Sequence, residues 1–307
     1  MDRGAAVVVL SWMLMFCCGL ARAAGDGAGA SAGSNTGKTW IVCVSGYDLY
    51  KYTYGFEAGI HNLCSKLAGK NQENLIIISP DSAAYHVRNS VPGKLVHGKR
   101  TVDDEFPNVY GTVNVTYKSE DMTKEIFYAI LSGDKKKVKG IGGEKVVQSG
   151  PQDTIILVFI NIGDYGVMTL TNNQYLWAEN FVPFLEDLQE ANKFKQMLIV
   201  VDGQNAGSNF DGYLCENCNI IAMTNTAKQD DLELCYYNGD VSAYSATCYT
   251  HFLTQHLEKL MTGKEAKTAT LFDLYQGTRE IMWFSDAISN LYGQLDMGNR
   301  KLSSFFQ

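Results

Sequence analysis

Histidine is scarce in this chain, and its distribution limits the chemistry available. The 307 residues include five histidines, and none lies between positions 98 and 250. A catalytic histidine therefore cannot come from the middle of the chain. Zinc is also disfavoured, because Cys215 and Cys218 form a single CxxC pair that no second pair or nearby histidine pair completes. We expect neither a metal nor a cofactor.

Positive charge is also in deficit. The formal net charge is −7, which disfavours nucleic acid or an anionic membrane surface as a partner. The basic run Lys135-Lys136-Lys137 has no aromatic residues between its lysines, so it is typical of a solvated loop.

The apolar stretch from Ala5 to Leu20 is short for a membrane span. Arg3 precedes it and the small residues around Ala23 follow it, which is the pattern of a signal peptide over residues 1–23. We therefore expect no membrane span after cleavage. The secretory pathway is the predicted route, with an extracellular or a lysosomal or vacuolar destination.

Residues 24–38 contain almost no bulky side chains, so we predict a flexible lead-in. An oxidising compartment would allow up to three disulfides among Cys43, Cys64, Cys215, Cys218, Cys235 and Cys248. Cys215 and Cys218 could bridge locally or pair with Cys235 or Cys248. Asn114 begins the one N-x-[ST] motif and is a glycosylation site if it is exposed.

Short β-branched apolar runs predict strands buried on both faces of a mainly parallel sheet. They cover 40–44, 75–78, 154–160, 197–201 and 219–223. Helical patterns alternate with them: one ends at Gly133, one begins with Asn180 as N-cap and Pro183 in its first turn, and two more cover 244–261 and 271–292. The alternation predicts a doubly wound α/β domain.

Reactive groups in such domains lie just past the carboxyl ends of the central strands. Two loops occupy that position here. They are Asn161–Asp164, after the run that ends at Ile160, and Asp202–Gly207, after the run that ends at Val201.

The same two loops carry a resemblance to a known family. The runs concerned are Val138–Gly142, Ser149–Asp153, Phe159–Gly163 and Asp202–Gly207. Together they closely resemble the legumain family of clan CD cysteine peptidases, the asparaginyl endopeptidases. The resemblance covers about residues 39–307 and implies a caspase/legumain-like peptidase domain without the family's C-terminal prodomain.

Legumain-type peptidases use a cysteine thiolate as nucleophile and a histidine that lowers the pKa of the thiol and protonates the leaving amine. The resemblance puts the histidine at Ile162 and the cysteine at Gln204. An asparagine that orients the histidine falls at Lys51. Ile162 does not titrate, and the carboxamide of Gln204 is neither a base nor a useful nucleophile. The resemblance therefore implies a catalytically silent member of the family.

The family's specificity pocket for asparagine is also altered. The resemblance puts its arginine at Thr53, a serine at about Leu232 and a later aspartate at about Thr247, whereas the acid before the cysteine is kept as Asp202. We expect asparagine recognition to be lost with the chemistry.

Two other pairs of residues are candidate sites. Cys248 and His251 share a helical face and could form a relocated dyad, although a disulfide at Cys248 is the simpler expectation. Asp164 and Asp202 could act as paired carboxylates, although a turn residue and a pocket remnant are simpler interpretations.

The sequence therefore predicts a secreted, inactive legumain-like protein that binds a protein or peptide. An aromatic group after the first strand is a candidate binding surface; it comprises Tyr47, Tyr50, Tyr52, Tyr54 and Phe56. The alternatives are an asparaginyl hydrolase or transpeptidase that works through relocated residues, and a structural or storage protein.

Overall fold

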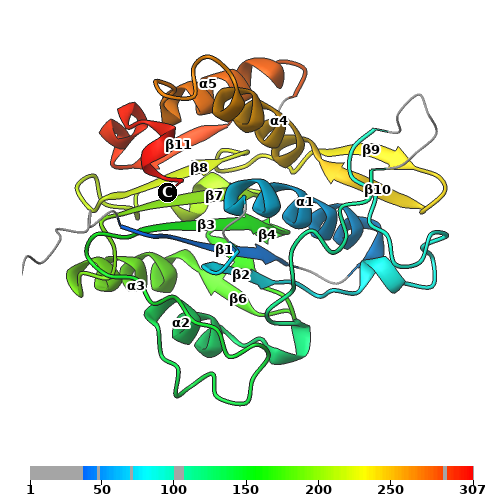
Figure 1. Ribbon diagram of the computed structural model, residues 1–307, viewed down its shortest axis with the longest axis horizontal. Helices are drawn as coiled ribbons and strands as arrows, with labels where there is room; N and C mark the ends of the chain where they lie inside the picture. Colours follow the sequence, from blue (N-terminus) through cyan, green and yellow to red (C-terminus); the bar gives the residue numbers. More distant parts are fainter. Residues whose placement is uncertain (1–36, 47–48, 70–71, 100–106, 286–288, 307) are drawn as a thin grey trace, which may run out of the picture. The chain divides into compact units, whose positions relative to one another are not determined.

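The β-branched runs form the central sheet, as the sequence predicts. A computed structural model describes residues 37–46, 49–69, 72–99, 107–285 and 289–306. The main sheet has six strands in the order β11-β8-β7-β3-β1-β2 (Figure 1). Their bounds are β1 Thr39–Ser45, β2 Leu75–Ile78, β3 Thr154–Ile160, β7 Gln196–Asp202, β8 Ile220–Thr224 and β11 Asn290–Gly293.

Five of these strands are parallel, and β11 at the edge pairs antiparallel with β8. Every residue of β1, β2, β3, β7 and β8 is buried. Strands covered on both faces have this pattern, because helices lie above and below a parallel sheet. From β1 the chain first adds β2 on one side of β1, and then adds β3, β7 and β8 on the other side. The switch point of the sheet therefore lies between the carboxyl ends of β1 and β3.

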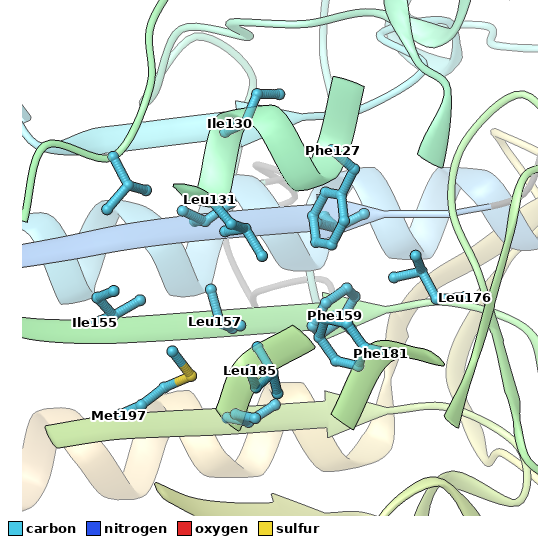
Figure 2. Packing of buried hydrophobic residues seen from close by; sticks show 14 of the residues in the cluster. Phe127, Ile130, Leu131, Ile155, Leu157, Phe159, Leu176, Phe181, Leu185 and Met197 are labelled. Atoms are coloured by element: carbon cyan, nitrogen blue, oxygen red, sulfur yellow. The ribbon is translucent and has the colours of Figure 1, made fainter. Parts of the chain in front are cut away.

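In the described part of the chain, two helices cover one face of the sheet and three cover the other. The helices are α1 Tyr50–Ala68, α2 Lys124–Ser132, α3 Ala178–Glu190, α4 Cys248–Thr262 and α5 Leu271–Ile281. Phe127 of α2 and Phe181 of α3 pack against Phe159 of β3 in the first core (Figure 2). The second core joins α1, α4 and α5 to the opposite side chains of the same strands, such as Val158. The predicted doubly wound α/β fold with helices on both faces is confirmed.

The structure corrects three predicted helix boundaries. Helix α3 begins at Ala178 with Trp177 as its N-cap residue, so Asn180 is not the cap and Pro183 lies in the second turn. The predicted helix over 244–261 begins only at Cys248, because Ala243–Thr247 forms strand β10. The predicted helix over 271–292 ends at Ile281, and residues 290–293 form β11.

Two small sheets lie beyond the carboxyl ends of the main strands. Strands β4 Gly163–Asp164, β5 Val167–Thr169 and β6 Tyr175–Trp177 form one, and the hairpin β9 Leu234–Asn238 with β10 Ala243–Thr247 forms the other. Helix α1 packs closely on the hairpin, since a Cβ at Gly55 would stand 2.9 Å from the Tyr244 carbonyl oxygen.

The predicted signal peptide lies outside the described residues, as does the lead-in up to residue 36. Lys38, the last residue of that lead-in, is already hydrogen-bonded: its backbone N–H donates to the Asp153 carboxylate at 2.7 Å. None of the helices in the described ranges is long and apolar enough to cross a membrane.

Candidate functional site

The loops that follow β3 and β7 lie against each other. Ile160 pairs with Asp202 in the last rung of the two strands, and the Asn161 N–H donates to the Asp202 carbonyl at 3.0 Å. Ile162 and Gln204 each lie two residues beyond that rung. A Cβ added to Gly163 would stand 2.9 Å from the Gln204 carbonyl oxygen. The structure therefore brings the two sequence-predicted positions to one edge of the sheet.

The side chains at these two positions make ordinary contacts. Ile162 is partly buried and packs against the second core. The Gln204 amide donates a hydrogen bond to the Asp231 carboxylate at 3.3 Å. Neither group offers a nucleophile or a base.

Lys51 lies in the first turn of α1, beside the hairpin. Its ammonium group is 5.7 Å from the Tyr52 ring centroid and 5.9 Å from that of Tyr244. Tyr244 faces Tyr237 across the hairpin, with 5.3 Å between ring centroids. These distances fit cation–π contact and an edge-on aromatic pair. We call Lys51, Tyr52, Tyr237 and Tyr244 the Lys51–tyrosine cluster.

Asp202 caps a helix. One oxygen of its carboxylate accepts hydrogen bonds from the Thr250 N–H at 2.9 Å and from the Thr250 hydroxyl at 2.6 Å. Thr250 lies in the first turn of α4, whose own N-cap residue, Thr247, makes no side-chain cap bond. A carboxylate at this end of a helix satisfies an otherwise unpaired N–H and complements the helix dipole. Complete burial raises the pKa of Asp202 to about 6, although the hydrogen bonds from Thr250 act to lower it.

The other positions of the expected specificity pocket leave little room for a ligand. Thr53, Asp202 and Thr247 are all fully buried at 0% exposure. Leu232 is partly buried and packs on the same core as Ile162. Asp202 and Thr247 are neighbours, but both are closed off from solvent.

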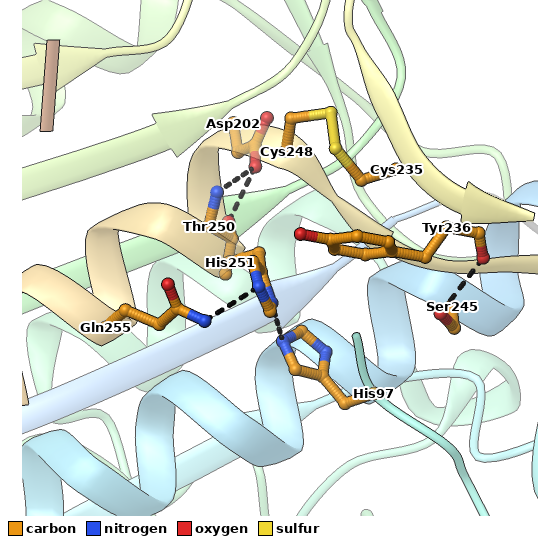
Figure 3. Close-up of a disulfide and its surroundings, with 9 residues drawn as sticks. All are labelled: His97, Asp202, Cys235, Tyr236, Ser245, Cys248, Thr250, His251 and Gln255. Atoms are coloured by element: carbon orange, nitrogen blue, oxygen red, sulfur yellow. Dashed lines mark hydrogen bonds between the residues drawn. A yellow bond between two sulfur atoms is a disulfide. The ribbon is translucent and has the colours of Figure 1, made fainter. Parts of the chain in front are cut away.

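The alternative dyad has no free thiol. Cys248 is bonded to Cys235 in a disulfide (Figure 3). His251 is buried, with Nδ1 3.3 Å from His97 Nε2 and Nε2 3.0 Å from the Gln255 amide nitrogen. Burial lowers the pKa of His251, and burial together with His251 lowers the pKa of His97 to about 3. The imidazole is thus held in a neutral buried network and not against a nucleophile.

The two carboxylates considered as a pair differ in environment. Asp164 is exposed in β4 and accepts a hydrogen bond from the Tyr165 N–H at 2.7 Å. Asp202 is fully buried in the helix cap. Asp164 thus accepts a hydrogen bond from the backbone of its own turn, whereas Asp202 is enclosed in the core.

The predicted aromatic surface is mostly core. Tyr50, Tyr54 and Phe56 are buried, and only Tyr52 remains partly exposed, while Tyr47 lies outside the described residues. The helical period explains the correction, because α1 packs against both the sheet and the hairpin and so buries most of its first two turns.

Sequence reasoning missed Glu57, a buried ionisable group on α1. The Glu57 carboxylate accepts hydrogen bonds from the N–H groups of Ser82 and Ala83, both at 3.1 Å, and so fixes the turn after β2. Burial raises the pKa of Glu57 to about 7. His61 is one turn further on, and both of its ring nitrogens lack a hydrogen-bond partner among the described residues. The available signal was a charged residue between two apolar positions of the helix, Phe56 and Ile60.

The disulfides settle the alternatives left by the sequence. Cys43 pairs with Cys64, Cys215 with Cys218, and Cys235 with Cys248. The CxxC pair is therefore bridged locally. Asn114 is exposed and so accessible to modification.

The sheet order, the helices on both faces and the paired loops define a doubly wound α/β protein. The model of the peptidase C13 family matches residues 39–307, so this chain belongs to the peptidase C13 family. That match contains the whole main sheet and both loops.

Known relatives include plant and animal legumains. The chain is 31% identical to legumain of Canavalia ensiformis over 197 residues, which is 64% of this chain and 40% of that protein. It is 28% identical to legumain of Homo sapiens over 215 residues, covering 70% and 48%. A vacuolar-processing enzyme of Phaseolus vulgaris is 32% identical over 197 residues, covering 64% and 38%. The matched region spans less than half the length of each of these relatives.

A solved structure of caspase-1 from Spodoptera frugiperda is also similar. It has a TM-score of 0.47 and 9% sequence identity, with 84% of this chain and 87% of that chain covered.

Proposed function

We propose that this chain is a secreted member of the family that does not hydrolyse peptides and instead binds polypeptide segments at the carboxyl edge of its sheet. The observation that carries the proposal is the pair of side chains in the two contacting loops. Ile162 packs on the core and Gln204 bonds to Asp231, so neither can perform acyl transfer.

Hydrolysis through relocated residues is the weaker alternative. It would require Cys248 to be free, whereas its sulfur is bonded to Cys235. It would also require His251 to face that sulfur, whereas both ring nitrogens have other neighbours.

We assign binding to the Lys51–tyrosine cluster. Tyr237 is 59% exposed, and Lys51 is also exposed. Tyrosine rings give a large contact area at a low cost in conformational entropy, and a lysine beside them adds a charge that attracts carboxylates. A polypeptide with aromatic and acidic side chains fits this surface best. The net charge of the whole chain, −7, disfavours nucleic acid in the same place.

The proposed location is the secretory pathway, with an extracellular or a lysosomal or vacuolar destination. It rests on the signal pattern in residues 1–23 and on the exposed glycosylation motif at Asn114. The name vacuolar-processing enzyme, carried by several relatives, fits the vacuolar option.

A phage-displayed random peptide library, selected on the folded protein, tests the binding proposal. We expect enriched peptides that are rich in aromatic and acidic residues. Lys51→Ala and Tyr237→Ala should each weaken binding of the enriched peptides at least about fivefold, the effect of losing about 1 kcal/mol at an interface hot spot.

Trp283→Ala is the matched control, because Trp283 is an exposed aromatic residue two positions beyond the end of α5 and is not part of the cluster. The proposal fails if no peptide is enriched, or if Trp283→Ala weakens binding as much as Tyr237→Ala does.

A further inference from the structure

A second group of chemically reactive side chains lies far from the two loops. Cys215 and Cys218 belong to the loop that enters β8 at its amino end, whereas Gln204 follows the carboxyl end of β7. Glu186 comes from the third turn of α3. The two sulfur atoms and a carboxylate oxygen of Glu186 all lie within 4.8 Å of one another. Two separate segments of the chain therefore meet at this point.

The surroundings of this group are largely apolar on one side. Cys218 is buried in the first core, and Cys215 packs against it while remaining partly exposed. Among the described residues, Glu186 has no ion-pair partner in this structure. A carboxylate beside two sulfurs, without an ion pair in the described part of the chain, is an arrangement that a metal ion can complete.

The chemistry of the donors selects the ion. Thiolates favour soft or borderline ions, and two thiolates with one carboxylate suit a tetrahedral Zn²⁺-class ion with the fourth position open to water. Bonds of about 2.0–2.3 Å to oxygen and sulfur would need only small side-chain movements from the positions seen here.

We propose that the reduced form of this chain binds a Zn²⁺-class ion through Cys215, Cys218 and Glu186, and that the Cys215–Cys218 disulfide closes this site. The sequence alone disfavours metal, because no second CxxC pair and no nearby histidine pair accompanies Cys215 and Cys218. The third ligand is supplied by the fold. The proposal is independent of peptide binding at the other edge of the sheet.

Opening the site requires a dithiol reductant. Its two thiols give two electrons and two protons to the Cys215–Cys218 bond, which becomes two thiols, while the reductant closes into its own disulfide. Metal binding then releases both protons as two sulfur–metal bonds and one oxygen–metal bond form.

The local bridge can open without loss of the fold. It joins residues 3 positions apart, against 21 for Cys43–Cys64 and 13 for Cys235–Cys248. The entropy that a crosslink removes from the unfolded chain grows with the length of the closed loop, so this bridge contributes least.

The test uses Co²⁺ as the probe ion. The native protein is treated with dithiothreitol without denaturant, freed of reductant under argon, and titrated with Co²⁺. We expect one Co²⁺ per chain and a thiolate-to-Co²⁺ charge-transfer absorption band. The unreduced protein has the same sequence and should show neither, so it is a control that needs no substitution.

Variants identify the ligands. Cys215→Ser combined with Cys218→Ser should abolish the absorption band, with an unchanged circular dichroism spectrum as the check on folding. Glu186→Gln should weaken Co²⁺ binding about tenfold or more. Glu179→Gln, an exposed carboxylate at the start of the same helix, should leave the affinity unchanged.

The proposal is overturned if the reduced protein takes up no Co²⁺, or if uptake persists when both cysteines are replaced. It is also overturned if Glu186→Gln binds as tightly as Glu179→Gln. None of these results bears on peptide binding, which is measured on the oxidised protein.

Discussion

Gly163 lies so close to Gln204 that a methyl group at Gly163 would stand 2.9 Å from the Gln204 carbonyl oxygen. It would also stand 2.9 Å from the Val167 carbonyl oxygen, so two backbone segments block it. We expect Gly163→Ala to lower the free energy of unfolding by about 1–3 kcal/mol, because the backbone must shift to relieve the overlap.

Urea denaturation checks this prediction. Gly150→Ala is the matched control, since nothing lies within 4 Å of a Cβ at that position. Equal stability of the two variants would contradict the contact between the loops.

The pairing of positions 162 and 204 predicts a change in thiol reactivity. Gln204→Cys alone should give a thiol with an ordinary pKa near about 8.5, because no imidazole faces it. Adding Ile162→His should lower the pKa of that thiol, so alkylation by iodoacetamide should persist to lower pH. The pH profile of the alkylation rate is the measurement, and identical profiles would show that the two positions do not face each other.

Asp202 should make stability depend on pH. Its pKa in the folded protein is raised to about 6, so folding favours the protonated form. The unfolded chain has a lower pKa, so stability is greatest in acid and is lost as the pH rises towards 6. Asp202→Asn cannot ionise. The stability of the native protein relative to this variant should fall by up to about 3 kcal/mol between pH 4 and pH 7.

Urea unfolding of both proteins across that range isolates the contribution of Asp202, because every other group is common to them. A constant difference would contradict a buried, titrating carboxyl in the cap of α4.

His61 should act in the opposite direction. Burial lowers the pKa of its imidazole to about 4, although Asp81 acts to raise it. The unfolded chain takes up a proton near pH 6.5 while the folded chain does not, so stability is lost as the pH falls from about 6.5 towards 4.

His61→Leu should remove up to about 3 kcal/mol of that acid sensitivity. Thermal unfolding of both proteins between pH 7 and pH 4 measures it. A native protein and a variant with parallel pH profiles would show that His61 is not buried in its neutral form.

The central strands could be predicted from the sequence because burial on both faces leaves a continuous β-branched run, as in Thr154–Ile160. The hairpin could not, because Ala243–Thr247 becomes a strand only by pairing with residues 5 to 13 positions earlier, such as Tyr237 opposite Tyr244. The helical pattern that follows Cys248 led us to predict a helix that begins too early, at residue 244. Tertiary contacts of this kind override local preference.

Part of the candidate site could also be predicted from the sequence, and part could not. The positions of Ile162 and Gln204 follow from the ends of β3 and β7, which the sequence locates. The closure of the pocket does not, because it depends on α4 bringing Thr250 to Asp202 across 48 residues. The third metal ligand, Glu186, is likewise brought to the cysteines only by the packing of α3.

Catalytic silence is the central claim, and hydrolysis of reporter peptides tests it most directly. Purified, disulfide-bonded protein would be incubated with asparagine and aspartate reporter peptides between about pH 4 and pH 7, beside an active legumain as the positive control. Loss of a nucleophile can lower the rate about a millionfold, so we predict no turnover above a blank without enzyme. Turnover by the native protein that disappears in Cys248→Ala would contradict the account.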